Sequence, residues 1–291
     1  MSGTDQKVST FSRIIFFHIP KTAGMSLRGI LVKTYREGLH FNTSIERDIS
    51  SANWNDCVAR IKKMFPQELD QHQVFKGHML FGIHEILPWP ADYITFLRDP
   101  VQRVVSHYRH QCRLGIHPAG HQIDPSRPDW NLGSVAATLD NYQTRLLAGT
   151  NPDLPFQCCT KEHLEAAKAN LDRHFKFVGL TEQFDLSLML LRHVCGWPRR
   201  FYVSDNIAPA DSIQFSPAVL EEIRRLNHLD QQLYDYARER FDRLVDQYGT
   251  KLQAELTLYR LGNRVHRNLH IMRHKIKQQL GIERRWPMAD S

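Results

Sequence analysis

The stretch that decides the fold is Ile14-Ile15-Phe16-Phe17-His18-Ile19-Pro20-Lys21-Thr22-Ala23-Gly24-Met25-Ser26, which lies near the start of the 291-residue chain. Its first four residues are β-branched or aromatic, as in a buried parallel strand. Pro20 ends that strand, and Gly24 allows the backbone to turn tightly. From Met25 onward the apolar residues recur at helical spacing. The segment therefore predicts a strand, a loop and a helix.

The loop of this segment carries groups that bind anions well. The backbone N–H groups of the first helical turn, the hydroxyls of Thr22 and Ser26, and the charge of Lys21 can all meet anionic oxygens. The order differs from the Gly-x-x-x-x-Gly-Lys-Ser/Thr of P-loop nucleotide triphosphatases, because here the lysine precedes the glycine. The alternative is an ordinary strand, turn and helix with a surface lysine.

A second segment repeats this organisation: Tyr93-Ile94-Thr95-Phe96-Leu97-Arg98-Asp99-Pro100-Val101-Gln102-Arg103-Val104-Val105-Ser106-His107-Tyr108. Its apolar run predicts a central strand, Pro100 suits the first turn of a helix, and Asp99 suits its N-cap. Arg98 at the strand end can grip a phosphate with two hydrogen bonds, and Ser106 can reach the same group. The alternative is that Arg98 pairs with a neighbouring aspartate at a sheet edge.

Two such sites at the carboxyl ends of strands in one sheet predict a ligand with two separate phosphate-like groups. With both segments in view, the chain resembles the sulfotransferases that use 3′-phosphoadenosine 5′-phosphosulfate (PAPS). Residues 20–26 are similar to that family's loop for the 5′-phosphosulfate, and residues 98–106 to its 3′-phosphate site. Residues 141–148 and 177–184 resemble segments of the carbohydrate branch, which includes the heparan sulfate 2-O- and 6-O-sulfotransferases.

This resemblance, which covers residues 12–200, implies a fold and a donor site. The implied fold is α/β and P-loop-like, with three α/β/α layers around a central parallel sheet and a helical C-terminal extension. We expect a sulfotransferase domain over residues 1–250 and a basic amphipathic tail over 251–291. The residues implied to hold the donor come from both segments: Lys21, Thr22, Ala23, Gly24, Met25, Ser26, Arg98 and Ser106.

A catalytic base is also implied by the resemblance, usually a histidine after the second strand. The run Val74-Phe75-Lys76-Gly77-His78 fits this pattern and lies between the two phosphate sites in the sequence. The 2-O enzymes carry His-Gly-His at the matching stretch, so Lys76 stands here in place of the first histidine. His78 suits a base because an unperturbed histidine, with a pKa of about 6.5, is available in its neutral form near neutral pH. A packed or surface histidine is the alternative.

These assignments predict in-line transfer of a sulfuryl group from PAPS to a hydroxyl of an acceptor, expected to be a carbohydrate. His78 would accept the hydroxyl proton, and Lys21 would neutralise the charge that builds on the leaving group. Arg98 and Ser106 would fix the orientation of the donor. We expect no metal, because a sulfuryl group carries less charge than a phosphoryl group and no acidic Walker-B-type residue is visible.

The identity of the acceptor is less well specified. Contacts to it are expected from a loop over residues 115–135 and from residues 200–215. Basic side chains near the site would suit a carboxylated or sulfated sugar, although they could equally be structural or face the donor: Lys76, Arg103, Arg109, Arg113 and Arg145.

Two other functions stay open at this level: a nucleotide-dependent kinase of related fold, and a catalytically inactive nucleotide-binding or scaffold protein. The Lys-before-Gly order and the missing metal ligands disfavour the kinase. Lys76 in place of histidine, together with a basic tail, would support the scaffold. His107 and His110 have a spacing seen among metal ligands, but without a second ligand pair a solvated helix face is preferred.

Positive charge is concentrated in the tail. The chain has a formal net charge of +7, and the nine basic and three acidic residues from Lys251 onward account for +6 of it. Apolar residues there predict one or two amphipathic helices, interrupted near Gly262. Packing on the domain or on another subunit, a membrane-surface helix, and contact with an anionic polymer are the alternatives. We expect no nucleic acid as a partner, because no motif for binding it is visible.

Cysteine content and the N-terminal sequence bear on the compartment. Five cysteines, without any Cys-x-x-Cys, predict reduced thiols in the cytosol. No N-terminal apolar stretch reaches the length of a signal peptide or membrane span. The heparan sulfate enzymes of this branch are anchored Golgi proteins, so we expect a cytoplasmic relative, or a protein of the Golgi lumen if the chain is a trimmed form. The number of subunits stays open.

Periodicity predicts the remaining elements. Helices are expected over residues 43–73, 100–114, 161–172, 183–195 and 217–247. On the first of these, Trp54, Val58, Ile61 and Phe65 would share one face. Strands are expected over residues 74–80, 92–98 and 175–180.

Overall fold

A five-stranded sheet forms the centre of the computed structural model, which describes residues 11–35, 39–43, 51–113, 140–150, 153–203 and 215–279. Neighbouring strands are parallel throughout, in the order β2-β3-β1-β4-β5. The predicted central parallel sheet is therefore confirmed. The strands are β1 (Ile14–Phe17), β2 (His40–Asn42), β3 (Val74–Gly77), β4 (Asp92–Leu97) and β5 (Phe175–Leu180).

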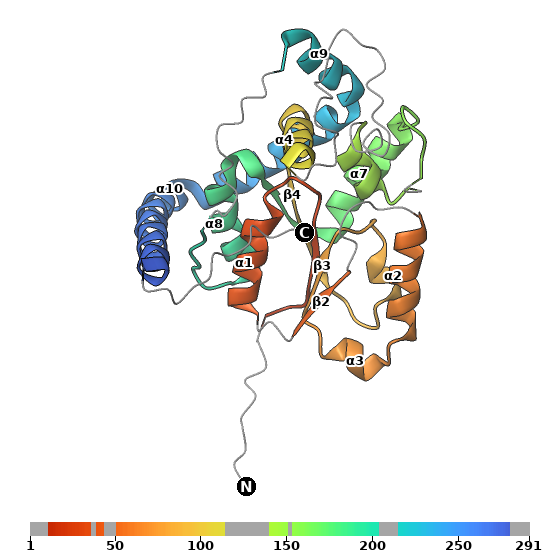
Figure 1. The fold of residues 1–291 in the computed structure, drawn as a ribbon. Helices are drawn as coiled ribbons and strands as arrows, with labels where there is room; N and C mark the ends of the chain where they lie inside the picture. The colour runs from red at the N-terminus through yellow and green to blue at the C-terminus, as the bar shows by residue number, and fades with distance from the viewer. Residues whose placement is uncertain are drawn as a thin grey trace.

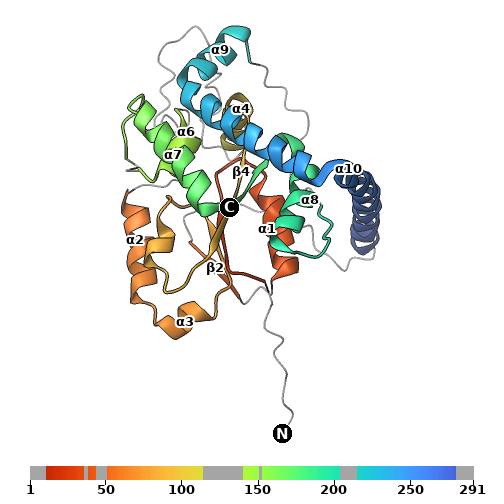
Figure 2. The same cartoon turned by 180° about the vertical axis from the view of Figure 1, so that it is seen from behind.

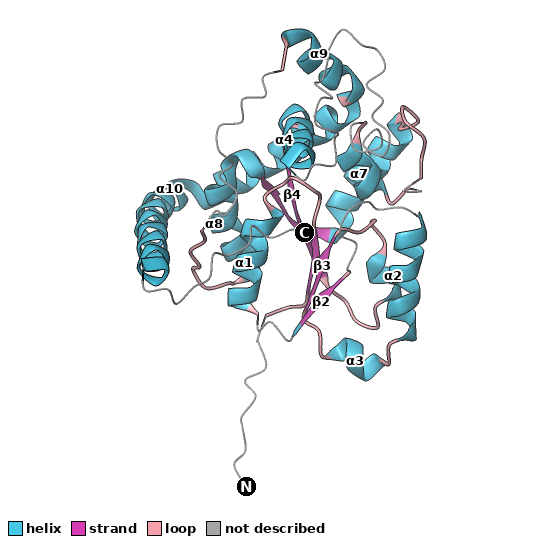
Figure 3. Ribbon diagram, in the orientation of Figure 1, coloured by secondary structure: helices cyan, strands magenta, loops and turns pink. Residues whose placement is uncertain are grey.

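Helices cover both faces of this sheet, which confirms the predicted three-layer α/β/α arrangement (Figure 3). Figures 1 and 2 show α1 (Gly24–Thr34) and α8 (Phe184–Cys195) on one face, and α2 (Ser51–Lys63) and α7 (Lys161–His174) on the other. All four residues of β1 are buried, as expected for a central strand between two layers.

Four further α-helices lie around this core. They are α3 (Pro66–Asp70), α4 (Pro100–Arg113), α6 (Tyr142–Ala148) and α9 (Pro217–Leu226). α4 follows β4 and stands at the end of the sheet to which the strands point (Figure 1). The segment expected to form one helix over 217–247 is divided at Asn227, where α9 ends before the next helix begins.

The last helix, α10 (His228–Gln279), forms the predicted helical extension. It is broken at Gly249, whose φ of 60° and ψ of −153° are not helical. The interruption expected near Gly262 was wrong, because the helix continues through that residue. Gly262 instead allows Phe201 to lie close to the backbone, since a Cβ there would come within 2.5 Å of the Phe201 ring. Leu252 and Tyr259, in the predicted tail, are buried in the core.

Two further details differ from the sequence-based expectations. Phe65 is 70% exposed, because α2 ends at Lys63 and Phe65 begins the next helix rather than continuing the buried face. The strand β2 was not predicted, and with three residues it is too short to show an alternating pattern. The loop over 115–135 lies outside the described residues, as do residues 204–214. Among the residues that are described, no helix is both long and apolar enough to cross a bilayer.

Candidate active site

Three loops meet at the carboxyl edge of the sheet. They follow β1, β3 and β4, and because β1 lies between the other two strands, its loop is flanked by theirs. The chain passes from β1 to β2 and β3 on one side and then returns to β4 on the other. Such a change of direction in a parallel sheet is where ligands bind. The two predicted phosphate sites and His78 are thus brought to one edge of the sheet.

The loop after β1 has a tightly turned backbone. Lys21 and Ala23 have φ angles of 71° and 63°, a region that residues other than glycine rarely occupy. Thr22 is buried, and its hydroxyl donates to the carbonyl of Ile19 at 2.8 Å. Its one hydroxyl proton is therefore used within the loop. These features hold the chain in the turn that leads into α1.

The N-terminus of α1 carries no neutralising group of its own. Ala23 occupies the N-cap position without a capping side chain, and the first turn contains no acidic residue. Helix N-termini bear partial positive charge and backbone N–H groups without an intrahelical partner. Ser26 is half-buried in this turn, while Met25 is 55% exposed. This arrangement suits the binding of an anion.

Arg98 joins the two predicted phosphate sites. Its guanidinium donates from Nη1 to the carbonyl of Lys21 at 3.1 Å. Its backbone exchanges two hydrogen bonds with the Gln143 side chain, at 3.0 and 2.8 Å. The neighbouring Asp99 caps α4 by accepting from the backbone N–H of Gln102 at 2.9 Å, as predicted for an N-cap. Arg98 is therefore held by α6 and reaches back to the loop after β1.

Cations surround the Lys21 ammonium. Burial, together with the nearby charges of Arg113 and Arg98, lowers the pKa of Lys21 to about 8. The pKa of His110 is lowered to about 4 by burial and then by Lys21 and Arg113. The last turn of α4 therefore lies within electrostatic range of the loop after β1. Such a concentration of positive charge is costly unless an anion accompanies it.

His78 directly follows β3 and is half-buried. Its ring lies 4.8 Å from that of His18, centroid to centroid, and His18 in turn stacks on Phe16 at 5.3 Å. Burial lowers the pKa of His18 well below its usual value, and the nearby His78 and Lys21 act in the same direction. His18 is therefore neutral beside the predicted base.

His18 is a site residue that sequence reasoning missed. Its position is explained by the strand register, because Phe17 of β1 pairs with Gly77 of β3, which places residues 18 and 78 side by side. The His18 ring also covers Gly24, where an added Cβ would lie 1.8 Å from Nε2. The glycine at the start of α1 is thus needed for the approach of this histidine.

Three of the basic residues considered for the acceptor are largely buried among protein groups. The Lys76 ammonium lies 2.9 Å from His40 Nδ1, and burial together with Lys76 lowers the pKa of His40 to about 4. Arg103 is fully buried, with its guanidinium 5.0 Å from the centroid of the Tyr142 ring.

Arg145 is also buried, and its guanidinium pairs with the Asp140 carboxylate. It further donates to the carbonyls of Asp140, Leu154 and Pro155 at 2.6–2.8 Å. Arg109 is only half-buried and lies 5.8 Å from the centroid of the Phe215 ring. The contacts of Lys76, Arg103 and Arg145 agree with a structural role for these three residues. Ser106 is half-buried on α4.

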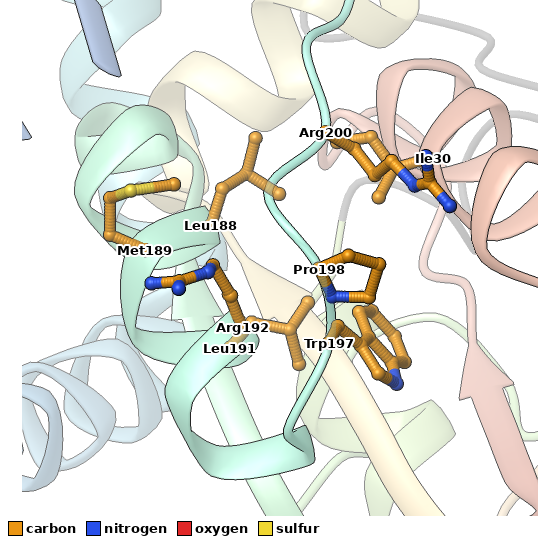
Figure 4. A pocket seen from close by; sticks show the side chains of 8 residues that line it. All are labelled: Ile30, Leu188, Met189, Leu191, Arg192, Trp197, Pro198 and Arg200. Carbon is orange, nitrogen blue, oxygen red and sulfur yellow. The ribbon is translucent and has the colours of Figure 1, made fainter. Parts of the chain in front are cut away.

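The part of the chain that the structure describes contains no group of three or more His, Cys, Asp or Glu residues arranged to hold a metal ion. All five cysteines are free thiols. A pocket between α1, α8 and the segment after α8 lies apart from the three loops described above (Figure 4). Its lining is mainly apolar, and Ile30 is its contribution from α1. This pocket therefore brings no additional chemical group to the site.

Residues 5–128 match a family model described as the sulfotransferase family. The resemblance to sulfotransferases is confirmed. This sulfotransferase match includes the loop after β1 with Lys21, the residue His78 and the second predicted anion site with Arg98 and Ser106.

Individual relatives point the same way. Heparan-sulfate 6-O-sulfotransferase 2 of Danio rerio is 30% identical over 225 residues, which make up 65% of this chain and 45% of that protein. Heparan-sulfate 6-O-sulfotransferase 1 of Homo sapiens is 30% identical over 195 residues, covering 56% of this chain and 46% of the relative. The chain thus spans about half the length of these curated relatives.

The chain also aligns with the crystal structure of a sulfotransferase from Alicyclobacillus acidocaldarius. The alignment covers 78% of the present chain and 96% of the sulfotransferase chain in that crystal structure. The two are 16% identical in sequence, and the TM-score is 0.42.

Proposed function

We propose that this protein is a PAPS-dependent O-sulfotransferase that modifies a hydroxyl group of a carbohydrate. The observation that carries the proposal is the junction of two cationic sites, in which Arg98 Nη1 donates to the carbonyl of Lys21 at 3.1 Å. Each site lies at the carboxyl end of a strand, and the two strands are neighbours in the sheet. Two adjacent cationic sites suit a donor that carries phosphate groups at both the 3′ and the 5′ position of its ribose.

The residues present fit such a donor. The uncapped N-terminus of α1 and the half-buried Lys21 would hold the 5′-phosphosulfate. Arg98 and Ser106 would hold the 3′-phosphate, since a guanidinium can donate two parallel hydrogen bonds to it. When bound, PAPS supplies the sulfuryl group and a phosphate leaving group.

His78 is the proposed general base. A neutral imidazole nitrogen of His78 would accept the proton of the acceptor hydroxyl as its oxygen becomes the nucleophile. Lys21 would stabilise negative charge at the phosphate end of the donor site, where its effect on the transition state is largest. The neutral His18 packs against His78 and would fix its ring without competing for the proton.

A carbohydrate acceptor is supported by the names of the relatives, which are heparan-sulfate 6-O-sulfotransferases. Basic residues near the site, including Arg109 and Arg113 on α4, favour an acceptor that carries carboxylate or sulfate groups.

Donor binding is tested by the thermal stability of the full chain. A ligand that binds only the folded state at about 100 times its dissociation constant adds about 2.7 kcal/mol of stability. We expect 3′-phosphoadenosine 5′-phosphate to raise the melting temperature of the wild type and of Arg238→Ala, a change at an exposed arginine on α10. Arg98→Ala should lose the shift. A shift with ATP and Mg²⁺ alone would contradict the proposal and favour a kinase.

Catalysis is tested separately with His78→Ala. Removing a general base should lower turnover about 10²–10⁴-fold. The variant should keep the melting shift with 3′-phosphoadenosine 5′-phosphate, because His78 lies beside the phosphate sites rather than in them. Sulfation of heparan sulfate and its desulfated forms, followed with radiolabelled PAPS, provides the assay. Unchanged turnover in His78→Ala would rule out this residue as the base.

A further inference from the structure

The second segment of α10, after the break at Gly249, has a face that packs on the body of the protein. Leu252, Leu256 and Tyr259 are buried there. Asn263 accepts from the backbone N–H of Tyr202 at 2.9 Å, and His266 stacks on Phe201 at 5.8 Å between ring centroids. These contacts fix the orientation of the helix, so its opposite side points away from the domain.

That outward side carries a row of large apolar residues, which we call the apolar stripe. Successive members are three or four residues apart, so they lie along one side of an α-helix. Their side chains are 44–61% exposed, and they make up most of the large apolar residues that the described part of the chain exposes. The stripe consists of Leu258, Leu261, Val265, Leu269, Met272 and Ile276.

Positive charge borders the stripe. Residues 258–279 include six Lys or Arg and no Asp or Glu. With about 100° of rotation per residue, Arg264 and Lys275 lie along one edge of the stripe and Arg273 along the other. The helix from 258 to 279 is about 33 Å long and stands at the rim of the molecule, outside α8 (Figures 1 and 2).

The combination of the apolar stripe with flanking positive charge distinguishes between the partners that could cover this face of the helix. Pairing the stripe with the same stripe of a second copy would bring its three bordering cations against the same three of the partner, with no Asp or Glu among residues 258–279 to separate them. An anionic polysaccharide would meet the cations but would leave the apolar side chains in water. A surface of anionic lipid satisfies both, because acyl chains accept the stripe while lipid headgroups meet the flanking charges.

We propose that residues 258–279 form an amphipathic helix that binds the protein peripherally to membranes rich in anionic lipid. The helix lies in the plane of the interface, with the apolar stripe at the boundary between headgroups and acyl chains. This helix contributes no residue to the proposed donor and acceptor sites. Membrane binding can therefore be tested separately from the enzymatic activity proposed above.

The test is co-sedimentation of the full chain with vesicles. One set consists of phosphatidylcholine alone, and the other contains about one-third phosphatidylserine. The variant Val265→Glu with Leu269→Glu places acids in the stripe. His270→Glu is the matched control, since it adds an acid at an exposed position about 140° around the same helix. Circular dichroism and melting temperature establish that each variant is folded.

We expect wild type and His270→Glu to sediment with the anionic vesicles, and the stripe variant to bind more than about tenfold more weakly. Binding should weaken between about 0.05 M and 0.5 M salt, as the screening length shortens. If the acidic variant is unfolded, Val265→Ser with Leu269→Ser takes its place, with the same expected loss.

Other results would overturn the proposal. Failure of wild type to bind anionic vesicles would do so, as would undiminished binding by the stripe variant. A dimer that the stripe variant converts to a monomer, without vesicle binding, would identify a second copy as the occupant. Retention on a sulfated polysaccharide that depends on the stripe, again without vesicle binding, would identify an anionic polymer.

Discussion

At the scale of single residues, Lys21 is held where its charge is difficult to maintain. Burial and the cations Arg113 and Arg98 bring its pKa to about 8. A bound phosphate would favour the charged ammonium and raise this pKa again. Ligand binding and proton binding at Lys21 are therefore coupled.

The first prediction follows from this coupling. Above pH 8 the free protein loses the Lys21 proton, so affinity for 3′-phosphoadenosine 5′-phosphate should fall, by up to about tenfold per pH unit. At pH 8 binding should take up a proton, which calorimetry in buffers of different ionisation enthalpy measures. Lys21→Arg is the control, because a guanidinium stays charged in this range and should remove the uptake. Binding without proton uptake by the wild type would show that Lys21 does not meet the ligand.

Gly24 leads to a second prediction. A Cβ at this position would lie 1.8 Å from His18 Nε2, and the ring is confined by Phe16 and His78. Gly24→Ala should therefore cost about 1–3 kcal/mol in the free energy of unfolding. Urea denaturation measures this, with Gly29→Ala in the same helix as the control. Equal stability of the two variants would mean that His18 moves freely, contrary to its packing.

At the scale of elements, α6 and α10 cap one another across a long separation in sequence. The Asp230 carboxylate accepts from the backbone N–H groups of Gln143 and Thr144 at 3.0 and 2.7 Å, at the start of α6. In return, the Asn141 side chain accepts from the backbone N–H groups of Leu229 and Asp230, at the start of α10. Each helix thereby supplies the N-cap that the other lacks.

Asp230 also lies within electrostatic range of the buried Arg103. Burial raises the pKa of this carboxyl, while Arg103 and the two backbone donors act in the opposite direction. Asp230→Ala would leave a buried guanidinium without this carboxylate, so we expect a loss of about 3–5 kcal/mol in urea denaturation. Asp235→Ala removes an exposed ion pair with Arg238 on the same helix and should cost at most about 1 kcal/mol. Similar losses in both variants would contradict a structural role for the buried pair.

The break in α10 gives the fourth prediction. Gly249 adopts a backbone conformation almost reserved for glycine, and no heavy atom lies within 4 Å of an added Cβ. Gly249→Ala should therefore be destabilising through backbone strain alone, by about 1–3 kcal/mol. Gly29→Ala meets no neighbour either, but within a helix it should stabilise the protein by about 0.5–1 kcal/mol. Urea denaturation of both variants checks the opposite signs.

At the scale of the whole molecule, local patterns were sufficient to predict four of the strands and the position of both predicted anion-binding segments at one edge of the sheet. Buried strands have continuous apolar runs, and Pro100 and Gly24 mark the turns that follow β4 and β1. The side chains of Lys21 and Arg98 could be placed at one edge because carboxyl ends of parallel strands share that edge.

The remaining features depend on contacts that no local pattern contains. The pairing of His18 with His78 requires the register of β1 on β3. The contact between Lys76 and His40 requires the short strand β2. The helix that continues through Gly262 packs there against Phe201, which lies about sixty residues earlier in the sequence. These contacts and the continuity of the helix at Gly262 therefore follow from tertiary packing, which helical periodicity in the sequence does not predict.

The mutual capping of α6 and α10 also has a consequence for synthesis of the chain. Asn141 and Gln143 leave the ribosome long before Leu229 and Asp230, and at 5–20 residues per second the delay is roughly 5–20 s. During that time the Asp230 carboxylate, which caps the start of α6 and lies near Arg103 in the folded protein, has not yet been synthesised. We therefore expect the start of α6 to be fixed only after α10 has emerged, so that contact with a chaperone would matter most during this stretch of translation.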